Sequence, residues 1–378
     1  MKIIVLKFGG TSVGSIIRIK KVAKIIRSYS KNYNVIVLSS AMSGTTNKLI
    51  NMSKKISNNF STYEYDTLVS SGEQISCSLL AGQLLEMGIK SRSWMAWQLP
   101  ILTDGEHKYS RIKYINKSPI LKFIKEGGIP IIAGFQGINK NLRITTIGRG
   151  GTDASAIMFA KFFKADRCVI YTDVEGVYTT DPHKLKSAKK IKKISYEEML
   201  EMASLGSKVM QPHSIQDARL NRINIEVKSS FINKVGTLIT KRKNIINNKI
   251  ITGISSTDND AKVTLIGVKD KPGIAASIFR PLSKNSINVD MVVQNISSNG
   301  KETDLTFTIK SYDLIKTKKI INKNKNISFK KMIFDKNVSK ISIIGVGMIT
   351  TPGVTFRMFQ ALAKQNINIQ VISTSEIK

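Results

Sequence analysis

Short apolar runs alternate with longer amphipathic segments through the first half of the chain. The apolar runs are rich in β-branched residues and lie at residues 3–7, 35–39, 130–134 and 168–172. Such runs are typical of strands that are buried on both faces of a parallel sheet. Segments with helical periodicity lie between them, at residues 16–29, 66–87 and 153–164. This βαβ order predicts an α/β fold with a three-layer, mostly parallel sheet, whose ligands bind at the carboxyl ends of the strands.

The last third of the chain contains an internal repeat. Residues 262–273 recur as residues 340–353, and each copy ends in a Pro-Gly pair that opens a helical segment. The register continues, because residues 287–289 match residues 367–369. Each copy is therefore predicted to be a strand, a Pro-Gly turn, a helix and a second strand.

These patterns predict the domain organisation. They divide the chain into residues 1–240, a connecting segment at 241–260, a first repeat copy at 261–335 and a second copy at 336–378. The first copy goes on through a predicted strand at residues 302–310 and a helix from Tyr312, and the second copy has no such continuation. We therefore expect an incomplete second α+β unit.

Composition places the chain among globular proteins. It has 378 residues, of which 42% are hydrophobic and 22% charged, and it has no apolar run near the roughly 20 residues of a membrane span. Residues 1–7 fit a strand better than a signal peptide, so a cytoplasmic location is expected. The net charge of +33 comes from scattered lysines without interleaved aromatic residues, which favours a solvated surface over nucleic-acid binding. Cys77 and Cys168 lack the spacing of a disulfide framework or a zinc site.

The first motif with candidate chemistry is Lys-Phe-Gly-Gly-Thr-Ser at residues 7–12. It places a lysine at the end of a predicted strand, followed by glycines that let backbone amides approach an anion. This arrangement suits a phosphate, although no Walker motif is present. The alternative is an ordinary turn with a lysine at the surface.

A second glycine-rich motif, Gly-Arg-Gly-Gly-Thr-Asp at residues 148–153, runs into a predicted helix. The amino end of that helix is a second candidate anion site. Arg149 offers a planar fork for a carboxylate, and Asp153 can hold a lysine or a magnesium-bound group. The alternative is a helix cap formed by Thr152 or Asp153, with Arg149 solvated.

Two further segments concentrate polar groups at strand and helix ends. Residues 39–46 are rich in hydroxyls, and Glu73 could bind an ammonium group, unless it only complements a helix dipole. Residues 171–178, followed by Asp181, could contact a ribose and a base, unless they form a polar turn. The histidines lack metal-ligand spacing and are assigned no role; they are His107, His183 and His213.

In this order and spacing the motifs resemble the aspartate kinases of the amino acid kinase family. The resemblance spans nearly the whole chain, and the C-terminal repeat resembles the pair of ACT domains found in that family. The matching segments are residues 7–12, 40–46, 72–73, 134–137, 148–153, 171–178 and 206–209. The resemblance implies the amino acid kinase fold, followed by ACT regulatory domains of which the second is incomplete.

The resemblance also implies a reaction in which ATP, with Mg²⁺, phosphorylates L-aspartate to 4-phospho-L-aspartate, the first step towards lysine, threonine and methionine. Lys7 and Asp153 are then the catalytic residues, with Asp153 orienting Lys7. The implied aspartate-binding residues are Thr46, Glu73, Arg149, Gly150, Gly151 and Thr152. The implied ATP-binding residues are Lys7, Phe8, Gly9, Gly10, Thr172, Asp173, Tyr178, Asp181 and Lys208.

The ACT resemblance implies an amino-acid effector, lysine or threonine, and assembly into a homodimer or a larger oligomer. The implied effector contacts are Asp270, Gly273, Ile274, Ala275, Asn288, Val289, Asp290 and Gln294. We expect neither a nucleic acid nor a membrane as a partner. The alternatives are another amino acid kinase and a catalytically silent amino-acid sensor. The intact Lys7, Glu73, Arg149 and Asp153 argue against the second of these.

Overall fold

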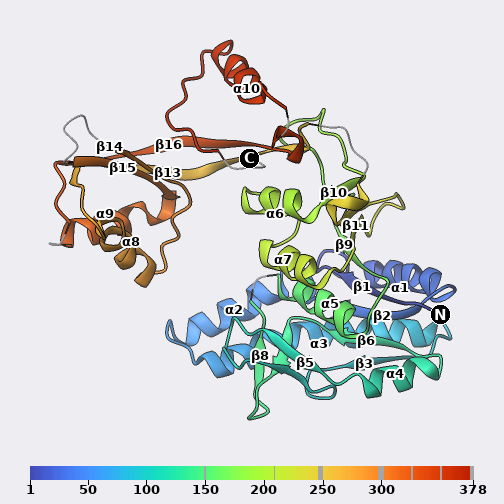
Figure 1. Ribbon diagram of the computed structural model, residues 1–378. Helices are drawn as coiled ribbons and strands as arrows, with labels where there is room; N and C mark the ends of the chain where they lie inside the picture. The colour runs from blue at the N-terminus through green and yellow to red at the C-terminus, as the bar shows by residue number, and fades with distance from the viewer. Residues whose placement is uncertain are drawn as a thin grey trace. The chain divides into compact units, whose positions relative to one another are not determined.

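The computed structural model forms two compact units, Met1–Gly253 and Ile254–Lys378 (Figure 1). It describes residues 1–148, 150–207, 209–245, 250–296, 302–324, 327–349 and 351–374. Within these residues no helix is both long enough and apolar enough to span a membrane. Each unit is described below by itself.

The N-terminal unit is built on an eight-stranded sheet with the order β10-β12-β11-β9-β1-β2-β6-β3. Its central strand, β1, pairs in parallel with both β2 and β9, whereas β11 and β12 pair antiparallel. The predicted parallel sheet is thus confirmed. The strands are β1 (Ile3–Phe8), β2 (Asn34–Ser39), β3 (Ser91–Trp94), β6 (Ile129–Ala133), β9 (Arg167–Thr172), β10 (Lys193–Ser195), β11 (Ile225–Ser229) and β12 (Thr237–Thr240).

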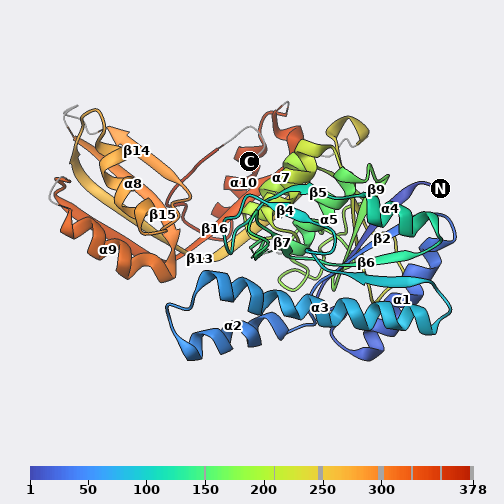
Figure 2. The ribbon, with the colours of Figure 1, turned by 90° about the horizontal axis from the view of Figure 1, so that it is seen from below.

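Helices cover both faces of this sheet, as Figure 2 shows for α1 and α3 on one side. Ile4, Leu6 and Phe8 of β1 join the apolar core beneath α1 and α3. Because side chains alternate along a strand, Lys7 points to the opposite face, where α5 packs on β1. The helices are α1 (Ile16–Ser30), α2 (Thr45–Ile56), α3 (Thr62–Glu86), α4 (Ser118–Lys125), α5 (Gly151–Phe162), α6 (Tyr196–Ser204) and α7 (Pro212–Asn221).

A second, four-stranded sheet with the order β5-β4-β7-β8 lies in the same unit. Its strands have three or four residues each, too few for a pattern of alternating polarity to reveal them, and sequence analysis missed them. The last strand, β8, ends two residues before the glycine-rich segment at 148–153. The strands are β4 (Ile101–Thr103), β5 (Ile112–Ile115), β7 (Gln136–Ile138) and β8 (Ile144–Thr146).

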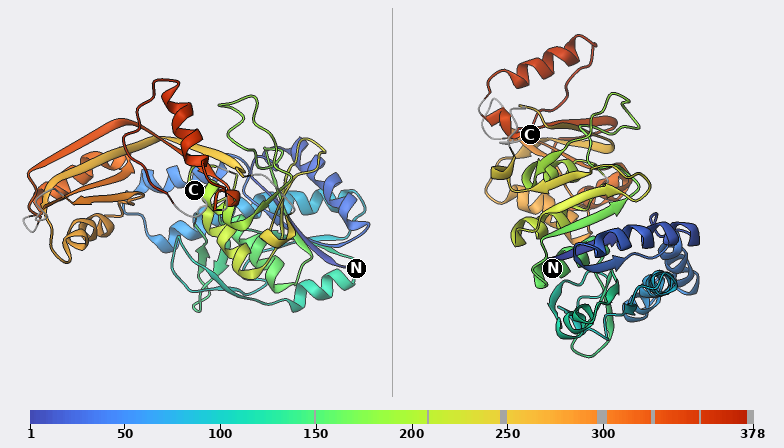
Figure 3. Two further views of the ribbon diagram at one scale, coloured as in Figure 1. Left: turned by 45° about the horizontal axis from the view of Figure 1, so that its top comes forward. Right: turned by 90° about the vertical axis from the view of Figure 1, so that its right-hand side faces the viewer.

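The C-terminal unit has a four-stranded sheet with the order β14-β15-β13-β16. Helices α8 (Ile274–Lys284) and α9 (Leu314–Lys323) pack on one face and enclose an apolar core that includes Ile278 and Phe307 (Figure 3). The predicted strand at residues 302–310 and the helix after it are present. The strands are β13 (Gly253–Lys269), β14 (Val292–Ile296), β15 (Glu302–Lys310) and β16 (Lys331–Ile344).

The second strand predicted for the first repeat copy is present as β14, but it begins after the residues that match between the copies, and the described part of the second copy has no such strand. In the first copy strand β14 begins only at Val292, and in the second copy residues 367–369, which follow helix α10 (Val354–Ala363), form no strand. Both segments instead close the helix before them. Ile287 N–H donates to Leu282 O and Ile367 N–H donates to Leu362 O, each at 3.0 Å.

This shared helix end is a further mark of the repeat. The residues just before the two isoleucines, Ser286 and Asn366, have φ of 58° and 54°. A residue in this left-handed conformation ends many helices, because it turns the following N–H back towards the helix carbonyls. The two copies therefore share a helix terminus as well as a Pro-Gly start.

The predicted connecting segment, residues 241–260, includes the start of β13 at Gly253. The residue before it, Thr252, is anchored in the N-terminal unit. Its hydroxyl donates to Oε1 of Glu198 at 2.6 Å, and Oε2 of the same carboxylate accepts from Ser195 in the capping box that starts α6. The last residues of the N-terminal unit are therefore hydrogen-bonded to the capping box at the start of α6.

Candidate active site

The candidate site begins at the carboxyl end of β1, where Lys7 meets Asp153. Nζ of Lys7 lies 2.6 Å from Oδ1 of Asp153, and both side chains are about nine-tenths buried. Lys7 comes from the central strand and Asp153 from the first turn of α5. An ion pair this well enclosed fixes the direction of the ammonium group, because few other positions satisfy both charges. The structure therefore brings together the two residues implied as catalytic.

The first glycine loop, residues 9–12, follows Lys7 directly. Gly9 N–H donates to Tyr171 O at 3.1 Å, and a Cβ on Gly10 would lie 2.7 Å from the backbone oxygen of Ala41. A Cβ on Gly9 would come within 3.4 Å of Nζ of Lys7. The absence of a side chain at Gly9 therefore keeps the approach to the lysine open, as a phosphate site requires, and its absence at Gly10 lets the loop lie against the backbone at Ala41.

Phe8, which the family resemblance placed among the ATP contacts, is fully enclosed. Its ring stacks on Tyr171, with 4.8 Å between the ring centroids. Its side chain is therefore part of the core beneath the loop, which leaves the backbone of Phe8 as the part that a nucleotide could contact.

The second glycine loop, residues 148–152, leads into α5. Gly148 and Gly150 have φ of 66° and 70°, and Gly150 is the residue that precedes the first turn of the helix. No side chain caps this helix, so the alternative in which Thr152 or Asp153 acts as the cap is wrong. Arg149 lies outside the described residues.

The second glycine loop is closely packed against its neighbours. A Cβ added to Gly151 would lie 2.7 Å from the side chain of Phe135, and a Cβ added to Gly150 would lie 2.4 Å from the side chain of Gln211. Thr152 in turn packs against Gly134, where an added Cβ would lie 2.4 Å away. The loop has no room for larger residues, which explains the spacing of its glycines.

Glu73 lies in the interior of α3 and is only 3% exposed. Its Oε1 accepts from Ala41 N–H at 3.0 Å, and its buried Oε2 has no hydrogen-bond partner among the described residues. Burial raises the pKa of this carboxyl to about 8. A role in complementing the helix dipole is excluded, because Thr62 begins the helix eleven residues earlier. The arrangement suits a cation that approaches the free oxygen.

The hydroxyl-rich segment, residues 39–46, packs closely on the same helix. A Cβ on Gly72 would lie 2.8 Å from the side chain of Ala41, and Ser76 Oγ donates to Ser40 O at 2.6 Å. Thr46 is half-buried in the first turn of α2, where the N–H of the preceding residue, Thr45, donates to Met42 O at 3.0 Å. Sequence analysis missed Ser76, which orients this segment from one turn beyond Glu73.

The implied nucleotide residues follow β9. Thr172 Oγ1 donates to Asp173 Oδ1 at 3.0 Å, and Tyr178 forms a backbone bridge with Lys190. Asp181 Oδ1 accepts from His183 N–H at 2.9 Å, so this carboxylate also supports its own turn. Lys208 lies outside the described residues.

The implied effector residues do not form one cluster within the chain. Asp270, Gly273, Ile274 and Ala275 follow the end of β13, where Lys269 pairs with Glu302. Asp290 instead bonds to Thr308, six residues further along β15 and roughly 20 Å away. It also pairs with Lys340. Asn288 and Val289 adjoin Asp290, and Gln294 lies between the two ends.

Comparison with known proteins places the chain. A model of the amino acid kinase family matches residues 2–229, and an ACT domain model matches residues 263–324 and 341–378. The aspartate kinase of Pseudomonas putida is 45% identical over 381 residues, which cover 100% of this chain and 92% of the relative. The chain belongs to the aspartate kinase branch of the amino acid kinase family. The family resemblance drawn from the motifs is confirmed.

Other members of the branch agree. The aspartokinase of Geobacillus stearothermophilus is 43% identical over 379 residues, covering 100% of this chain and 92% of the relative. The structure of E. coli aspartokinase III in complex with aspartate and ADP has a TM-score of 0.82 and covers 100% of this chain and 95% of that chain. At 24% identity this last likeness shows the shared fold.

Proposed function

We propose that the chain is an aspartate kinase, which transfers the γ-phosphoryl group of ATP to the side-chain carboxylate of L-aspartate. The products are ADP and 4-phospho-L-aspartate. The observation that carries the proposal is the buried Lys7–Asp153 ion pair, which joins the first glycine loop to the end of the second. The full-length identity with aspartate kinases supports aspartate as the acceptor.

The reaction requires charge neutralisation more than acid–base chemistry. One carboxylate oxygen of aspartate forms a bond to the γ-phosphorus, while the bond from that phosphorus to the bridging oxygen breaks and ADP leaves with the electron pair. No proton is transferred, because the nucleophile is already ionised at neutral pH. The barrier comes from bringing two anions together, so a fixed cation and oriented amides lower it.

The site residues have separate roles in this scheme. Lys7 neutralises the negative charge of the phosphoryl group that is being transferred, and Asp153 orients the Lys7 ammonium group. The free Oε2 of Glu73 accepts the substrate ammonium, which converts a costly buried group into a paired one. Thr46 and the second glycine loop, with Arg149, hold the α-carboxylate.

ATP fits the open approach at the first glycine loop, with Thr172, Asp173, Tyr178 and Asp181 as the candidate contacts for the rest of the nucleotide. In the described part of the chain, no group of three or more His, Cys, Asp or Glu side chains could hold a metal. Mg²⁺ bound on the ATP phosphates would neutralise their charge, with few direct ligands from the protein.

The C-terminal unit supports a regulatory role. We propose that lysine or threonine acts as the effector and that the chain assembles as a homo-oligomer through its ACT units. E. coli aspartokinase III has also been solved with lysine and aspartate bound. Because the implied effector contacts are split between two ends of one sheet, a complete pocket would take residues from two chains.

One assay tests the reaction against its alternatives. ADP release is measured with L-aspartate, with L-glutamate and with no acceptor. We expect release that depends on aspartate, and its phosphorylated product should be trapped by hydroxylamine as the hydroxamate. Release with glutamate alone would instead indicate another amino acid kinase, and no release with either would indicate a silent sensor.

A further inference from the structure

Asp66 is a buried carboxylate that the reaction scheme does not use. It lies in the first turns of α3, and its side chain is completely enclosed. Carboxylates are rarely buried without several hydrogen-bond donors around them, since desolvation is costly. The donors around Asp66 therefore indicate what it holds in place.

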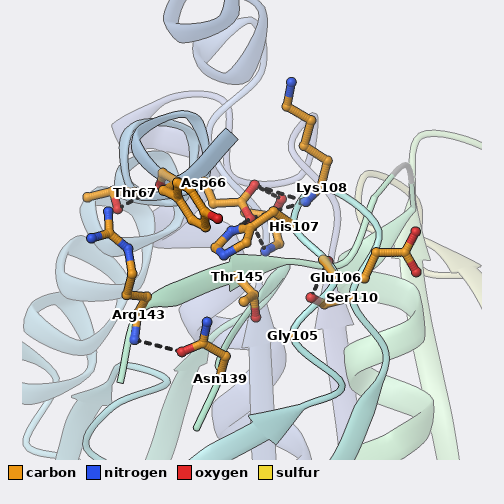
Figure 4. A network of polar contacts seen from close by, with 12 residues as sticks. Asp66, Thr67, Gly105, Glu106, His107, Lys108, Ser110, Asn139, Arg143 and Thr145 are labelled. Carbon is orange, nitrogen blue, oxygen red and sulfur yellow. Dashed lines mark hydrogen bonds and ion pairs between the residues drawn. The ribbon is translucent and has the colours of Figure 1, made fainter. Parts of the chain in front are cut away.

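Four donors from two segments converge on Asp66. Thr146 contributes its hydroxyl to Oδ1 at 2.6 Å and its N–H to Oδ2 at 3.2 Å. Lys108 contributes its N–H to Oδ2 at 3.1 Å, and Nδ1 of His107 lies 2.7 Å from the same oxygen. Figure 4 shows the ring of His107 and the backbone of Lys108 beside Asp66, with the Lys108 side chain extending away from the carboxylate. Asp66 thus joins the end of β8 to the loop at residues 104–110, called here the 104–110 loop.

Both partners of Asp66 support the second glycine loop. Thr146 ends β8, and Gly148 follows two residues later. The 104–110 loop touches the same place, since a Cβ on Gly148 would lie 3.2 Å from both Lys108 O and the ring of Tyr109. Ser110 N–H closes the arrangement by donating to Thr146 O at 2.9 Å. A change in the position of the Asp66 carboxylate would therefore shift Gly148, the first residue of the second glycine loop.

Asp66 and Glu73 are seven residues apart on α3, which is two turns or about 10 Å along one face of the helix. One rigid helix thus carries the group assigned to the substrate ammonium and the group that anchors the loop assigned to its α-carboxylate. We propose that Asp66 is a positioning residue for aspartate, because it sets the distance between these two halves of the site. This inference rests on the proposed function.

A purely structural role for Asp66 makes a different prediction. Loss of a buried hydrogen-bond network alone would lower the free energy of unfolding and the amount of folded enzyme. The surviving molecules would keep their KM values. A positioning role instead changes the KM for aspartate in enzyme that is fully folded.

The test compares Asp66→Asn, Thr146→Val and Thr146→Ser in the full chain. Asp66→Asn replaces one carboxylate oxygen by an NH2 group, which cannot accept a hydrogen bond from the surrounding donors. Thr146→Val removes the hydroxyl donor, and Thr146→Ser keeps it. Asp104→Asn is the matched control, because the side chain of Asp104 accepts from Arg111 N–H within the same part of the chain and not from Thr146. Kinetic constants and melting temperatures are measured for each variant.

We expect Asp66→Asn and Thr146→Val to raise the KM for aspartate by about tenfold or more, while kcat changes by less than about threefold and the KM for ATP by less than about twofold. Thr146→Ser and Asp104→Asn should stay within about twofold of the wild type on all three constants. If Asp66→Asn fails to fold, the valine and serine pair decides the question alone.

Two results would overturn the inference. An unchanged KM for aspartate in folded Thr146→Val, with only a lower melting temperature, reduces Asp66 to a structural residue and leaves the proposed function intact. A wild-type enzyme without aspartate-dependent turnover overturns the proposed function, and this inference with it. A double variant, Asp66→Asn with Thr146→Val, should cost less than the sum of the single changes if both act through one contact.

Discussion

The two glycine loops lie at the same edge of the sheet, but different parts of the protein hold them. The two glycines of the first loop are held by backbone groups, since Gly9 N–H donates to Tyr171 O, Ser43 N–H donates to Gly10 O, and Gly10 lies against Ala41 O. The last two residues of that loop accept from side chains, Thr11 O from Arg18 and Ser12 Oγ from Ser230. The second loop is fixed by side chains, among them Gln211 and the Asp66 network.

The difference follows what each loop is proposed to bind. Phosphate groups are alike in every nucleotide, and a main-chain support at the two glycines suits them, because side-chain substitutions elsewhere change it little. The acceptor must be distinguished from its homologues, and a loop held by side chains can be adjusted one residue at a time. Five predictions test this contrast and the site between the loops, from the largest expected effect to the smallest.

Lys7→Ala should lower kcat by about 10³-fold, because its charge acts where negative charge is shared in the transition state. The KM for aspartate should change little. Steady-state kinetics with varied aspartate and ATP will measure both constants. An alanine variant that keeps its turnover would remove Lys7 from the chemistry at the first loop.

Gly10→Ala should damage the first loop severely, because the new methyl group would meet a backbone oxygen at 2.7 Å that cannot move alone. We expect a loss of roughly 1–3 kcal/mol in the free energy of unfolding and a large rise in the KM for ATP. Urea unfolding and nucleotide titration check the two effects. A variant with normal ATP binding would show that the loop is less rigid than its backbone contacts imply.

Glu73 should make aspartate binding depend on pH. With a pKa of about 8 the carboxyl is protonated in the empty site at neutral pH, and it must lose that proton to accept the ammonium. The KM for aspartate should therefore fall by up to about tenfold per unit as the pH rises towards 8. Glu73→Gln should bind aspartate weakly and lose this dependence. A wild-type KM that is flat between pH 6 and 8 would contradict the assignment.

The same group should affect stability in the opposite direction. Because the folded pKa is raised, the contribution of Glu73 to the free energy of unfolding is greatest below its ordinary pKa of 4.5 and declines as the pH rises towards 8. Glu73→Gln should therefore melt at a higher temperature than the wild type at pH 8, and at a similar temperature near pH 4.5.

Gly150→Ala should have the mildest effect. Its φ of 70° costs alanine about 1 kcal/mol, and the added methyl group meets the side chain of Gln211. Gln211→Ala in the same chain should recover part of the loss in aspartate KM, since it removes the atom that the methyl group meets. No single side-chain truncation should rescue Gly10→Ala in this way, and finding one would erase the contrast between the loops.

Sequence alone predicted the strands that carry the site, because they are buried on both faces and flanked by helices. It also found both glycine loops and the residues at their ends, since those residues adjoin strand ends in the sequence. Asp66, Thr146 and His107 were missed, because their network joins segments 41 and 80 residues apart. A single chain gives no sign of such contacts, although an aspartate seven residues before Glu73 on a helix could have been noted.

The late start of β14, and the lack of a second strand in the described part of the other copy, have a local cause. Ile-Asn-Val at residues 287–289 and Ile-Asn-Ile at 367–369 have high strand propensity, yet each begins with the isoleucine that closes a helix. The hydrogen bond from the isoleucine N–H to a carbonyl of the preceding helix outweighs the strand propensity of these residues. A left-handed Ser or Asn before them gives a weaker signal than a glycine would.

The hydroxyl of Thr252, which donates to Glu198 at the start of α6, determines where the chain can be divided. A gene fragment that stops at residue 240 would encode a kinase whose α6 cap has lost one partner, whereas a fragment that continues to Gly253 would keep it. Limited proteolysis should therefore release a stable catalytic fragment that retains Thr252. Exchange of regulatory units between relatives should succeed when the junction is placed after that residue.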